Sequence, residues 1–358
     1  MKNLILCLVA GSLMLTSCKK NLEDDLPPLD TAKKEVISNY SATIFAGNET
    51  AASVDGTGRD AKFYQINKIT VDQAGNVYVL EVAKSGNSFF KIRKVTPGGI
   101  TSTIFNGGEG AVGVTGKIYK ILDIATKADG TLYVLASMAN SAITTYEGGI
   151  SKVYQEYGVY KLNGDVLVDV SVSNTMANYG AQPSTWVAEH NLLSNITVDA
   201  GGTLYGAYKA NIVGAGTKVY QITPNPKLIE GNTSAVIAAT LTAGAAGAAY
   251  ASTESDILKI TASGVSKIFT FPAVKTSFKP KLAGSFNGNL IIYGDVYDKA
   301  NAFKGTGFYT IKTDGTVVTK SLLNTPVNVV AALMVAGKIY YVVQITSGAY
   351  VIYKVTLD

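Results

Sequence analysis

Hydrophobic residues alternate with polar ones in short runs along this chain, and a glycine turn separates successive runs. The pattern is clearest where Ile69 and Val71 precede Gly75, and Val77 and Val79 follow it. Alternation with a period of two on both sides of a glycine is typical of a β-hairpin. The turn motif Gly-x-x-Tyr recurs at Gly75, Gly130, Gly202, Gly247 and Gly337, and at Gly288 with Ile in place of Tyr.

A second hairpin follows each of these turns. Asn163-Gly164 and Asp314-Gly315 supply the positive-φ positions that two such hairpins need. Each unit therefore holds four strands, labelled a to d here. Six units of about 45–50 residues predict an all-β fold, a six-bladed β-propeller of four-stranded blades. The first hairpin of the fourth unit, within residues 235–251, is rich in Ala and would equally suit a short helix.

The last unit lacks a fourth strand. Residues 349–356 match strand c, and then the sequence stops. Residues 40–45 (Tyr-Ser-Ala-Thr-Ile-Phe) resemble residues 101–105 (Thr-Ser-Thr-Ile-Phe), which form strand d of the first full unit. We therefore expect the N-terminal strand to pair with the C-terminal blade and to close a ring over residues 39–358, because an open blade would expose an unpaired edge.

Three segments of the first unit stand out: Asp55-Gly-Thr-Gly-Arg-Asp-Ala-Lys-Phe63, residues 69–79 and Ile92-Arg-Lys-Val-Thr-Pro-Gly-Gly99. With these segments, the first unit resembles an NHL-repeat β-propeller. The resemblance is weaker around residues 196–205, and only the turn spacing and second hairpin persist in units four to six. Asp72 and Asp199 stand just before the a–b turns, where Asx turn formation is the expected role.

The beginning of the chain predicts export and lipid attachment. Lys2 and the apolar residues 4–15 form a signal peptide over residues 1–17, and Leu15-Thr16-Ser17-Cys18 resembles a bacterial lipobox with Cys18 as the acylated residue. The alternative is an ordinary secretory signal with a chance Cys. The polar, proline-containing residues 18–38 read as a flexible tether. Lys followed by Glu23, Asp24 and Asp25 resembles the surface-export signal of Bacteroidetes lipoproteins.

These features predict an outer-membrane lipoprotein of the cell envelope that is held by the acyl chains on Cys18, with display on the cell surface favoured over the periplasmic face. Without the signal peptide the net charge is 30 − 26 = +4, with no run of Lys or Arg, which disfavours nucleic acid as a partner. Only 16% of residues are charged, far below what disordered or coiled-coil chains need.

One position of strand a is expected to line the mouth of the central channel. It lies seven residues before each turn glycine and is occupied by Lys68, Asp123, Asn195, Thr240, Lys281 and Val330. The next residue is apolar in every unit and should pack blade on blade. The polar members, Lys68, Asp123, Asn195 and Lys281, could bind a polar or anionic ligand, or could simply be solvated or pair with one another.

Catalysis is disfavoured by the residues available. Some six-bladed relatives are Ca²⁺-dependent hydrolases, and others of NHL type use several His. A calcium site usually takes two or more carboxylates, and this ring supplies one. The single His190 cannot build a multi-His zinc site, and we expect it to be a loop or packing residue. We therefore expect no metal and no cofactor, although Tyr, Lys or Asp could still act as acid or base.

Two insertions carry aromatic residues. The b–c connection of the second unit, residues 137–157, contains Tyr146, Tyr154 and Tyr157, and the following d–a connection, residues 172–194, contains Tyr179, the only Trp (Trp186) and His190. Long connections of this kind are often functional. Their rings could grip a sugar or a protein, or could pack under their own loops.

The function expected from these observations is a lipid-anchored binding module that presents its loop face to a glycan or protein partner. The alternative is a propeller lyase or metal-assisted hydrolase with its site at the channel mouth.

Overall fold

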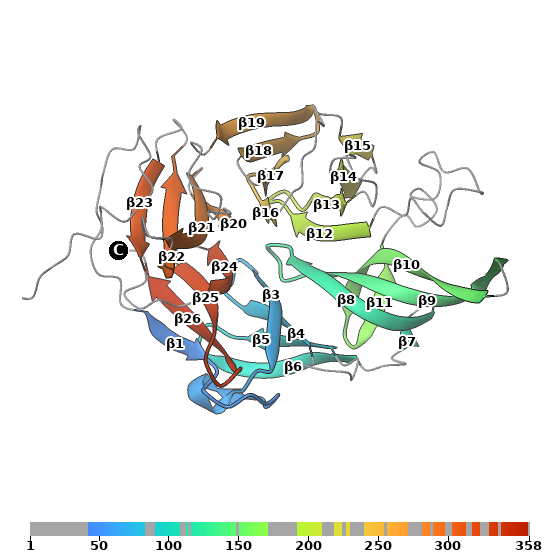
Figure 1. Cartoon of the computed structure of the whole chain (residues 1–358), viewed down its shortest axis with the longest axis horizontal. Helices are drawn as coiled ribbons and strands as arrows, with labels where there is room; N and C mark the ends of the chain where they lie inside the picture. The colour runs from blue at the N-terminus through green and yellow to red at the C-terminus, as the bar shows by residue number, and fades with distance from the viewer. Residues whose placement is uncertain are drawn as a thin grey trace, which may run out of the picture.

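The computed structural model arranges six antiparallel sheets around a common centre, as a six-bladed β-propeller (Figure 1). Blades are numbered 1 to 6 here, in chain order of their innermost strands. The structure describes residues 42–82, 90–107, 112–113, 116–147, 150–170, 192–209, 218–223, 227–229, 240–253, 256–270, 281–286, 289–297, 303–312, 317–322, 329–335 and 338–356. Within these ranges no helix is long and apolar enough to cross a bilayer.

Blades 1 and 2 carry an extra short strand each. Blade 1 comprises β3 (Gln65–Val71), β4 (Val77–Val82), β5 (Phe90–Val95) and β6 (Ile100–Gly107), and β2 (Gly56–Thr57) pairs with its outer edge. The short 3-10 helix η2 (Gly58–Asp60) follows β2. Blade 2 comprises β8 (Gly116–Thr126), β9 (Leu132–Glu147), β10 (Ile150–Asn163) and β11 (Val166–Asp169), with β7 (Val112–Gly113) beside β8.

Blades 3, 4 and 5 are plain four-stranded sheets. Blade 3 comprises β12 (Leu192–Val198), β13 (Leu204–Lys209), β14 (Lys218–Thr223) and β15 (Lys227–Ile229). Blade 4 comprises β16 (Thr240–Ala243), β17 (Ala248–Ser252), β18 (Asp256–Thr261) and β19 (Gly264–Thr270). Blade 5 comprises β20 (Lys281–Phe286), β21 (Asn289–Tyr297), β22 (Phe303–Ile311) and β23 (Val317–Leu322). The Ala-rich start of blade 4 is thus a strand pair, not a helix.

Blade 6 combines both ends of the sequence. Its inner strands are β24 (Val329–Val335), β25 (Lys338–Gln344) and β26 (Tyr350–Thr356), and β1 (Thr43–Ala46) completes the sheet. Thr43 pairs with Lys354 and Ile44 with Tyr353 in an antiparallel register. The predicted closure is confirmed.

The blades are held together by six apolar clusters, one at each blade boundary. The residue that follows the predicted mouth position is buried in every blade, as the sequence predicts: Ile69, Ile124, Ile196, Leu241, Leu282 and Ala331. The cluster at the closing boundary joins Ile69 and Val79 of blade 1 to Leu333 and Val342 of blade 6. Burial of apolar surface between neighbouring sheets therefore fixes the ring.

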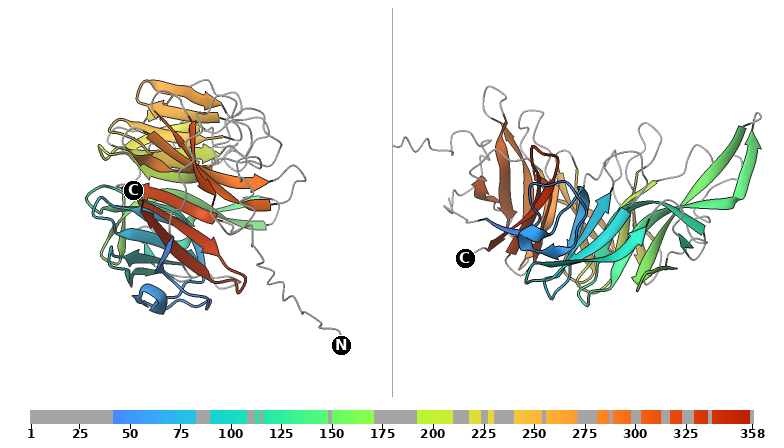
Figure 2. Two further views of the ribbon diagram at one scale, coloured as in Figure 1. Left: turned by 90° about the vertical axis from the view of Figure 1, so that its left-hand side faces the viewer. Right: turned by 90° about the horizontal axis from the view of Figure 1, so that it is seen from below.

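Blade 2 departs from the repeat. Residues 137–157, expected as a long b–c loop, are mostly strand, because β9 runs to Glu147 and β10 starts at Ile150. The two strands form one long hairpin that projects beyond the ring (Figure 2). Residues such as Ile, Thr, Val and Tyr favour extended backbone, so the insertion lengthens the hairpin.

Candidate functional site

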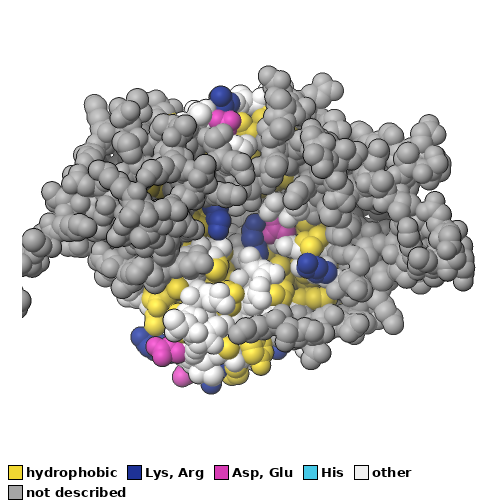
Figure 3. Space-filling view, in the orientation of Figure 1, with side chains coloured by type: hydrophobic (Ala, Val, Ile, Leu, Met, Phe, Trp, Pro, Cys, Tyr) yellow, Lys and Arg dark blue, Asp and Glu magenta, His cyan; other side chains and the backbone are white. Residues whose placement is uncertain are grey.

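The six predicted mouth residues all lie on the innermost strands, and we call them the mouth ring: Lys68, Asp123, Asn195, Thr240, Lys281 and Val330. Basic and acidic side chains gather at the middle of the face in Figure 3. Thr240, Lys281 and Val330 lie at or beside the first residue of their inner strands, whereas Lys68 and Asn195 lie at the middle of theirs and Asp123 lies toward the end of β8. The β9–β10 hairpin extends toward the side at which the inner strands begin, since Lys117 at the start of β8 pairs with Ala139 and the hairpin continues beyond that pair. We call this side the loop face.

Lys68 and Asp123 join blades 1 and 2. The Nζ atom of Lys68 lies 3.1 Å from Oδ1 of Asp123 and 3.2 Å from Oδ2. The lysine side chain is 27% exposed and the aspartate side chain only 2%. The pair is therefore reachable from solvent on the lysine side alone.

Asp123 also binds backbone on either side of the next boundary. The N–H of Ile124 donates to Oδ1 at 2.8 Å, and the N–H of Ile196 on blade 3 donates to Oδ2 at 2.9 Å. Burial raises the pKa of the Asp123 carboxyl, and the Lys68 charge and the two backbone donors oppose that shift only in part. Asp123 thus links three consecutive blades.

Thr240 repeats this arrangement between blades 4 and 5. Its Oγ1 accepts a hydrogen bond from the N–H of Leu282 at 2.9 Å and lies 2.7 Å from the hydroxyl of Ser252. Leu282 on β20 and Ile196 on β12 are equivalent residues of their inner strands. Asp123 and Thr240 therefore each bind the backbone of the next blade, whereas the Lys68–Asp123 contact pairs two members of the ring itself.

The side chains of Asn195 and Lys281 have fewer polar partners than Asp123 in the described part of the chain. The side-chain amide of Asn195 donates to Ser194 Oγ at 3.1 Å. The ammonium of Lys281 lies 5.7 Å from the centre of the Tyr293 ring, a cation–π contact. No ion pair involves Lys281 among the residues that the structure describes.

The aromatic candidates cannot be placed in the site. Tyr179, Trp186 and His190 lie outside the described residues. Tyr146 on β9 and Tyr154 on β10 lie in the part of the hairpin that projects beyond β8. Tyr157 instead pairs with Ser137, which pairs with Lys120, so it lies within the blade. Among the residues that are described, no group of three His, Cys, Asp or Glu side chains could hold a metal ion.

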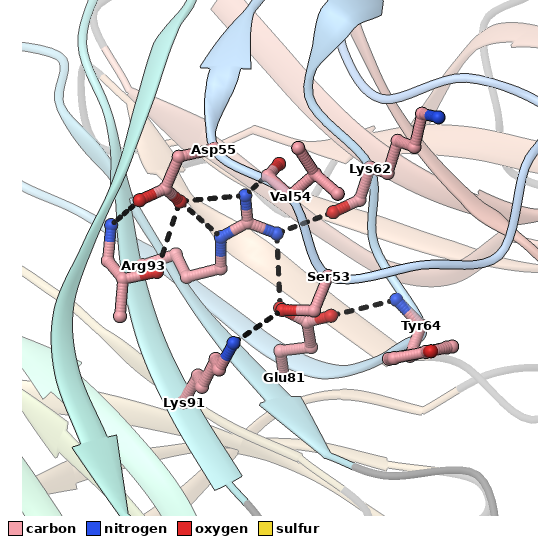
Figure 4. A network of polar contacts seen from close by, with 9 residues as sticks. Ser53, Val54, Asp55, Lys62, Tyr64, Glu81, Lys91 and Arg93 are labelled. Carbon is pink, nitrogen blue, oxygen red and sulfur yellow. Dashed lines mark hydrogen bonds and ion pairs between the residues drawn. The ribbon is translucent and has the colours of Figure 1, made fainter.

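A second polar cluster, missed by sequence reasoning, lies inside blade 1 (Figure 4). Arg93 is fully buried and pairs with the equally buried Glu81 at 3.1 Å and with Asp55 at 2.9 Å. The guanidinium also donates to the carbonyl oxygens of Val54 and Lys62. Every one of these partners belongs to blade 1 or to the segment that follows β1.

This cluster fastens the segment between β1 and β3. Glu81 accepts from the backbone N–H of Tyr64 at 2.8 Å and from Ser53 at 3.1 Å. Burial alone would raise the pKa of Asp55, but hydrogen bonds from Thr103 and the Arg93 charge together lower it. All these groups satisfy one another, which makes the cluster structural. Opposite charges on neighbouring strands, Glu81 on β4 and Arg93 on β5, are the signal that could have revealed it.

The aspartates before the a–b turns cap those turns, as predicted. Asp72 accepts from the backbone N–H of Asn76 at 2.9 Å and from the Tyr78 hydroxyl at 3.1 Å. Asp199 likewise accepts from Thr203, and it also reaches the N–H of Gly247 on blade 4 at 2.7 Å. In these two turns, the tyrosine of the Gly-x-x-Tyr motif therefore bonds the aspartate that precedes the turn, at 3.1 Å for Tyr78 and 3.4 Å for Tyr205.

Fold and site together define a six-bladed β-propeller with a polar ring on its innermost strands. Solved structures with this fold are similar over most of the chain. A Bacteroides thetaiotaomicron protein of unknown function has a TM-score of 0.50 and 15% identity, covering 88% of this chain and 76% of its own. Virginiamycin B lyase from Staphylococcus aureus has a TM-score of 0.45 and 13% identity, and the match covers 89% of this chain and 100% of the lyase. A gluconolactonase from Xanthomonas campestris has a TM-score of 0.46 and 8% identity, and the match covers 82% of this chain and 87% of the gluconolactonase.

At 15% identity, the similarity to the Bacteroides thetaiotaomicron protein is a likeness of fold alone. No protein-family model matches the chain, and a sequence search of curated proteins gives no match either. The NHL resemblance of blade 1 therefore remains a resemblance.

Proposed function

We propose that this protein is a lipid-anchored propeller of the cell envelope that binds a glycan or protein partner through its loop face. The observation that carries the proposal is the β9–β10 hairpin. Its strands have 16 and 14 residues, against 6 and 6 for the equivalent strands of blade 1. A two-stranded ribbon is marginally stable alone, so one that projects beyond its sheet gains by covering or gripping a partner.

Shortening the hairpin tests this proposal. Residues 140–154 are replaced by Asn-Gly, which joins the directly paired Ala139 and Gln155 through a two-residue turn. All pairs between β8 and β9 are retained, so the blade should fold. Full-length protein in detergent is applied to a glycan array and used in cross-linked pull-downs from envelope fractions. We expect the shortened protein to lose its ligands, and unchanged binding would exclude the hairpin.

The aromatic residues of the neighbouring insertion supply a second arm of the same test. Trp186→Ala and Tyr179→Ala should each weaken binding if their rings contact the ligand, whereas His190→Ala should leave it unchanged if that residue only packs. Undiminished binding by both aromatic variants would remove them from the proposed surface.

The membrane anchor is tested separately. We expect metabolic labelling with palmitate to modify the protein, and Cys18→Ser to abolish the label and release the protein from membranes. Cys7→Ser is the matched control, because Cys7 lies within the proposed signal peptide and should have no effect. Protease treatment of intact cells distinguishes display on the outer surface from a periplasmic location.

An enzyme at the mouth ring is the second candidate. It is favoured by the raised pKa of Asp123 beside Lys68, since buried carboxylates with shifted pKa values are common in active sites. Binding is preferred here because each Asp123 oxygen already accepts a backbone N–H and because the side chain is only 2% exposed. Turnover of lactone or ester substrates that Asp123→Asn abolishes would reverse this preference.

A further inference from the structure

The mouth ring has more hydrogen-bond donors than acceptors. Asp123 is the one acidic member, and Lys68 and two backbone N–H groups occupy its oxygens. Thr240 is likewise engaged by Ser252 and Leu282. An ammonium carries three donors, so Lys68 keeps at least one after pairing with both oxygens of Asp123. The formal charge of the ring is 2 − 1 = +1.

Lys281 is the cation of the ring without a carboxylate partner in the described part of the chain. Its ammonium lies against the face of Tyr293, a ring that is 4% exposed. An aromatic face attracts a cation but accepts no strong hydrogen bond, so no described residue occupies the three N–H groups of Lys281.

A neutral polar pair stands on the same ring. Asn195 and Ser194 are adjacent on β12, and the amide of Asn195 donates to Ser194 Oγ while Ser194 donates to the carbonyl of Ala207. Among the described residues, none binds the carbonyl oxygen of Asn195 or its second N–H, and these two groups suit hydroxyls, which both donate and accept. The ring therefore combines cations with amide groups suited to hydroxyls.

We infer that the mouth ring binds the carboxylate of an acidic sugar, with Lys281 and Lys68 on the carboxylate and Asn195 on neighbouring hydroxyls. Charge-assisted hydrogen bonds from ammonium to carboxylate are stronger than neutral ones, which selects acidic sugars over neutral ones. A peptide C-terminus would share the carboxylate but would not need the amide of Asn195. The inference rests on the proposed binding function and names its ligand class.

The test uses matched probes that differ only in the carboxylate. Trigalacturonate, a glucuronate-containing disaccharide and sialyllactose are each titrated beside their methyl esters, with full-length protein in detergent and ligand-observed NMR. We expect at least one acid to bind about tenfold more tightly than its ester, because losing a charge-assisted bond costs about one factor of ten. The difference should shrink as salt is added.

Variants assign the effect to the ring. Lys281→Met should weaken binding of the acid about tenfold and leave the ester unchanged, whereas Lys281→Arg should retain most of the affinity. Lys161→Met, at an exposed position of β10, is the charge-matched control and should bind like the unaltered protein. Thermal unfolding of each variant shows that it is folded.

Equal binding of acid and ester, no binding of any acid, or no effect of Lys281→Met would overturn the inference. A tripeptide with a free C-terminus is compared with its amide in the same way. The sugar assignment would be overturned if the free tripeptide binds more tightly than the amide and none of the acidic sugars binds. The hairpin-shortened protein separates the two proposals. Suppose that the shortened protein no longer binds its ligands on the array, while the unaltered protein binds acid and ester equally in titration. The proposed binding function of the loop face would then stand, and the proposed sugar site at the mouth ring would be rejected.

Discussion

The backbone N–H of Ile196 donates to the Asp123 carboxylate across a blade boundary, at 2.9 Å. The two residues are 73 positions apart in the chain. Because Lys68 of blade 1 binds the same carboxylate, one side chain couples three inner strands. The mouth ring is therefore part of the scaffold as well as a candidate binding surface.

Removing the Asp123 charge should weaken the contacts between the inner strands of blades 1, 2 and 3. Asp123→Asn leaves Lys68 without its partner and one backbone donor poorly satisfied, so we expect the free energy of unfolding to fall by about 3 kcal/mol. Urea denaturation followed by circular dichroism measures the loss. Asp165→Asn, at an exposed turn position, is the control and should change stability by less than about 0.5 kcal/mol. Equal stability of both variants would contradict the coupling.

Arg93 should be among the most sensitive residues of blade 1. Arg93→Met leaves Glu81 charged and buried, for which we expect a loss of about 3–5 kcal/mol. Adding Glu81→Leu removes the stranded charge, so the double variant should be more stable than Arg93→Met alone. Limited proteolysis should cut residues 47–64 faster in the single variant, since Arg93 holds the carbonyls of Val54 and Lys62. A double variant less stable than the single one would argue against this account.

Alkaline pH should weaken the a–b turns. Burial, followed by the charge of the neighbouring aspartate, raises the pKa of Tyr78 and of Tyr205 from 10.0 to about 12. The folded state thus keeps a proton that the unfolded state loses near pH 10. Stability is complete below pH 10 and falls as the pH rises from 10 to about 12, by about 1–2 kcal/mol per tyrosine.

The Tyr78→Phe and Tyr205→Phe double variant provides the comparison. It lacks both hydroxyls, so its unfolding free energy should depend less on pH in that window, even though it is lower at neutral pH through the lost hydrogen bonds. Denaturant titrations at several pH values, with tyrosinate absorbance to follow ionisation, measure this. Identical pH dependence in both proteins would show that these tyrosines titrate normally.

Locking the ring closure should stabilise the whole propeller. Thr43 and Lys354 are direct partners across β1 and β26, at a separation suited to a disulfide. Thr43→Cys with Lys354→Cys closes a very long loop, so the oxidised protein should be more stable than the reduced one by about 2–5 kcal/mol. Each single Cys variant should show no such redox effect. A destabilised oxidised form would mean that the strand pairing is strained.

Much of this fold could be predicted from the sequence because its signals are local. Glycine turns, period-two alternation and the apolar residue after each mouth position sit within a few residues of one another, and the number of blades follows from their repetition. The pairing of β1 with β26 required only that residues 40–45 resemble another strand d. The prediction of a loop at residues 137–157 is wrong, since the repeat carries no information about an insertion, whereas the Ile, Thr, Val and Tyr residues within it favour strand.

The chemistry of the mouth ring could be predicted only in part. Alignment of the repeats identified Lys68 and Asp123 as neighbours in the ring, because equivalent residues of successive blades adjoin. It could not show that Asp123 accepts the N–H of Ile196, since that bond depends on how closely two inner strands approach. The Arg93 cluster was missed for a similar reason, because Asp55 reaches Arg93 from a segment without regular strand pattern.

Closure by β1 and β26 has a consequence for the order of assembly. The hydrogen bond from Thr43 to the Lys354 carbonyl spans 311 positions. At a synthesis rate of about 5–20 residues per second, roughly 15 to 60 s pass between the synthesis of β1 and that of its partner β26. Five blades can form in the meantime, but the sixth cannot. β1 therefore stays without its partner strand until β26 has been synthesised, and a factor that covers β1 in that time would protect the protein from misassembly.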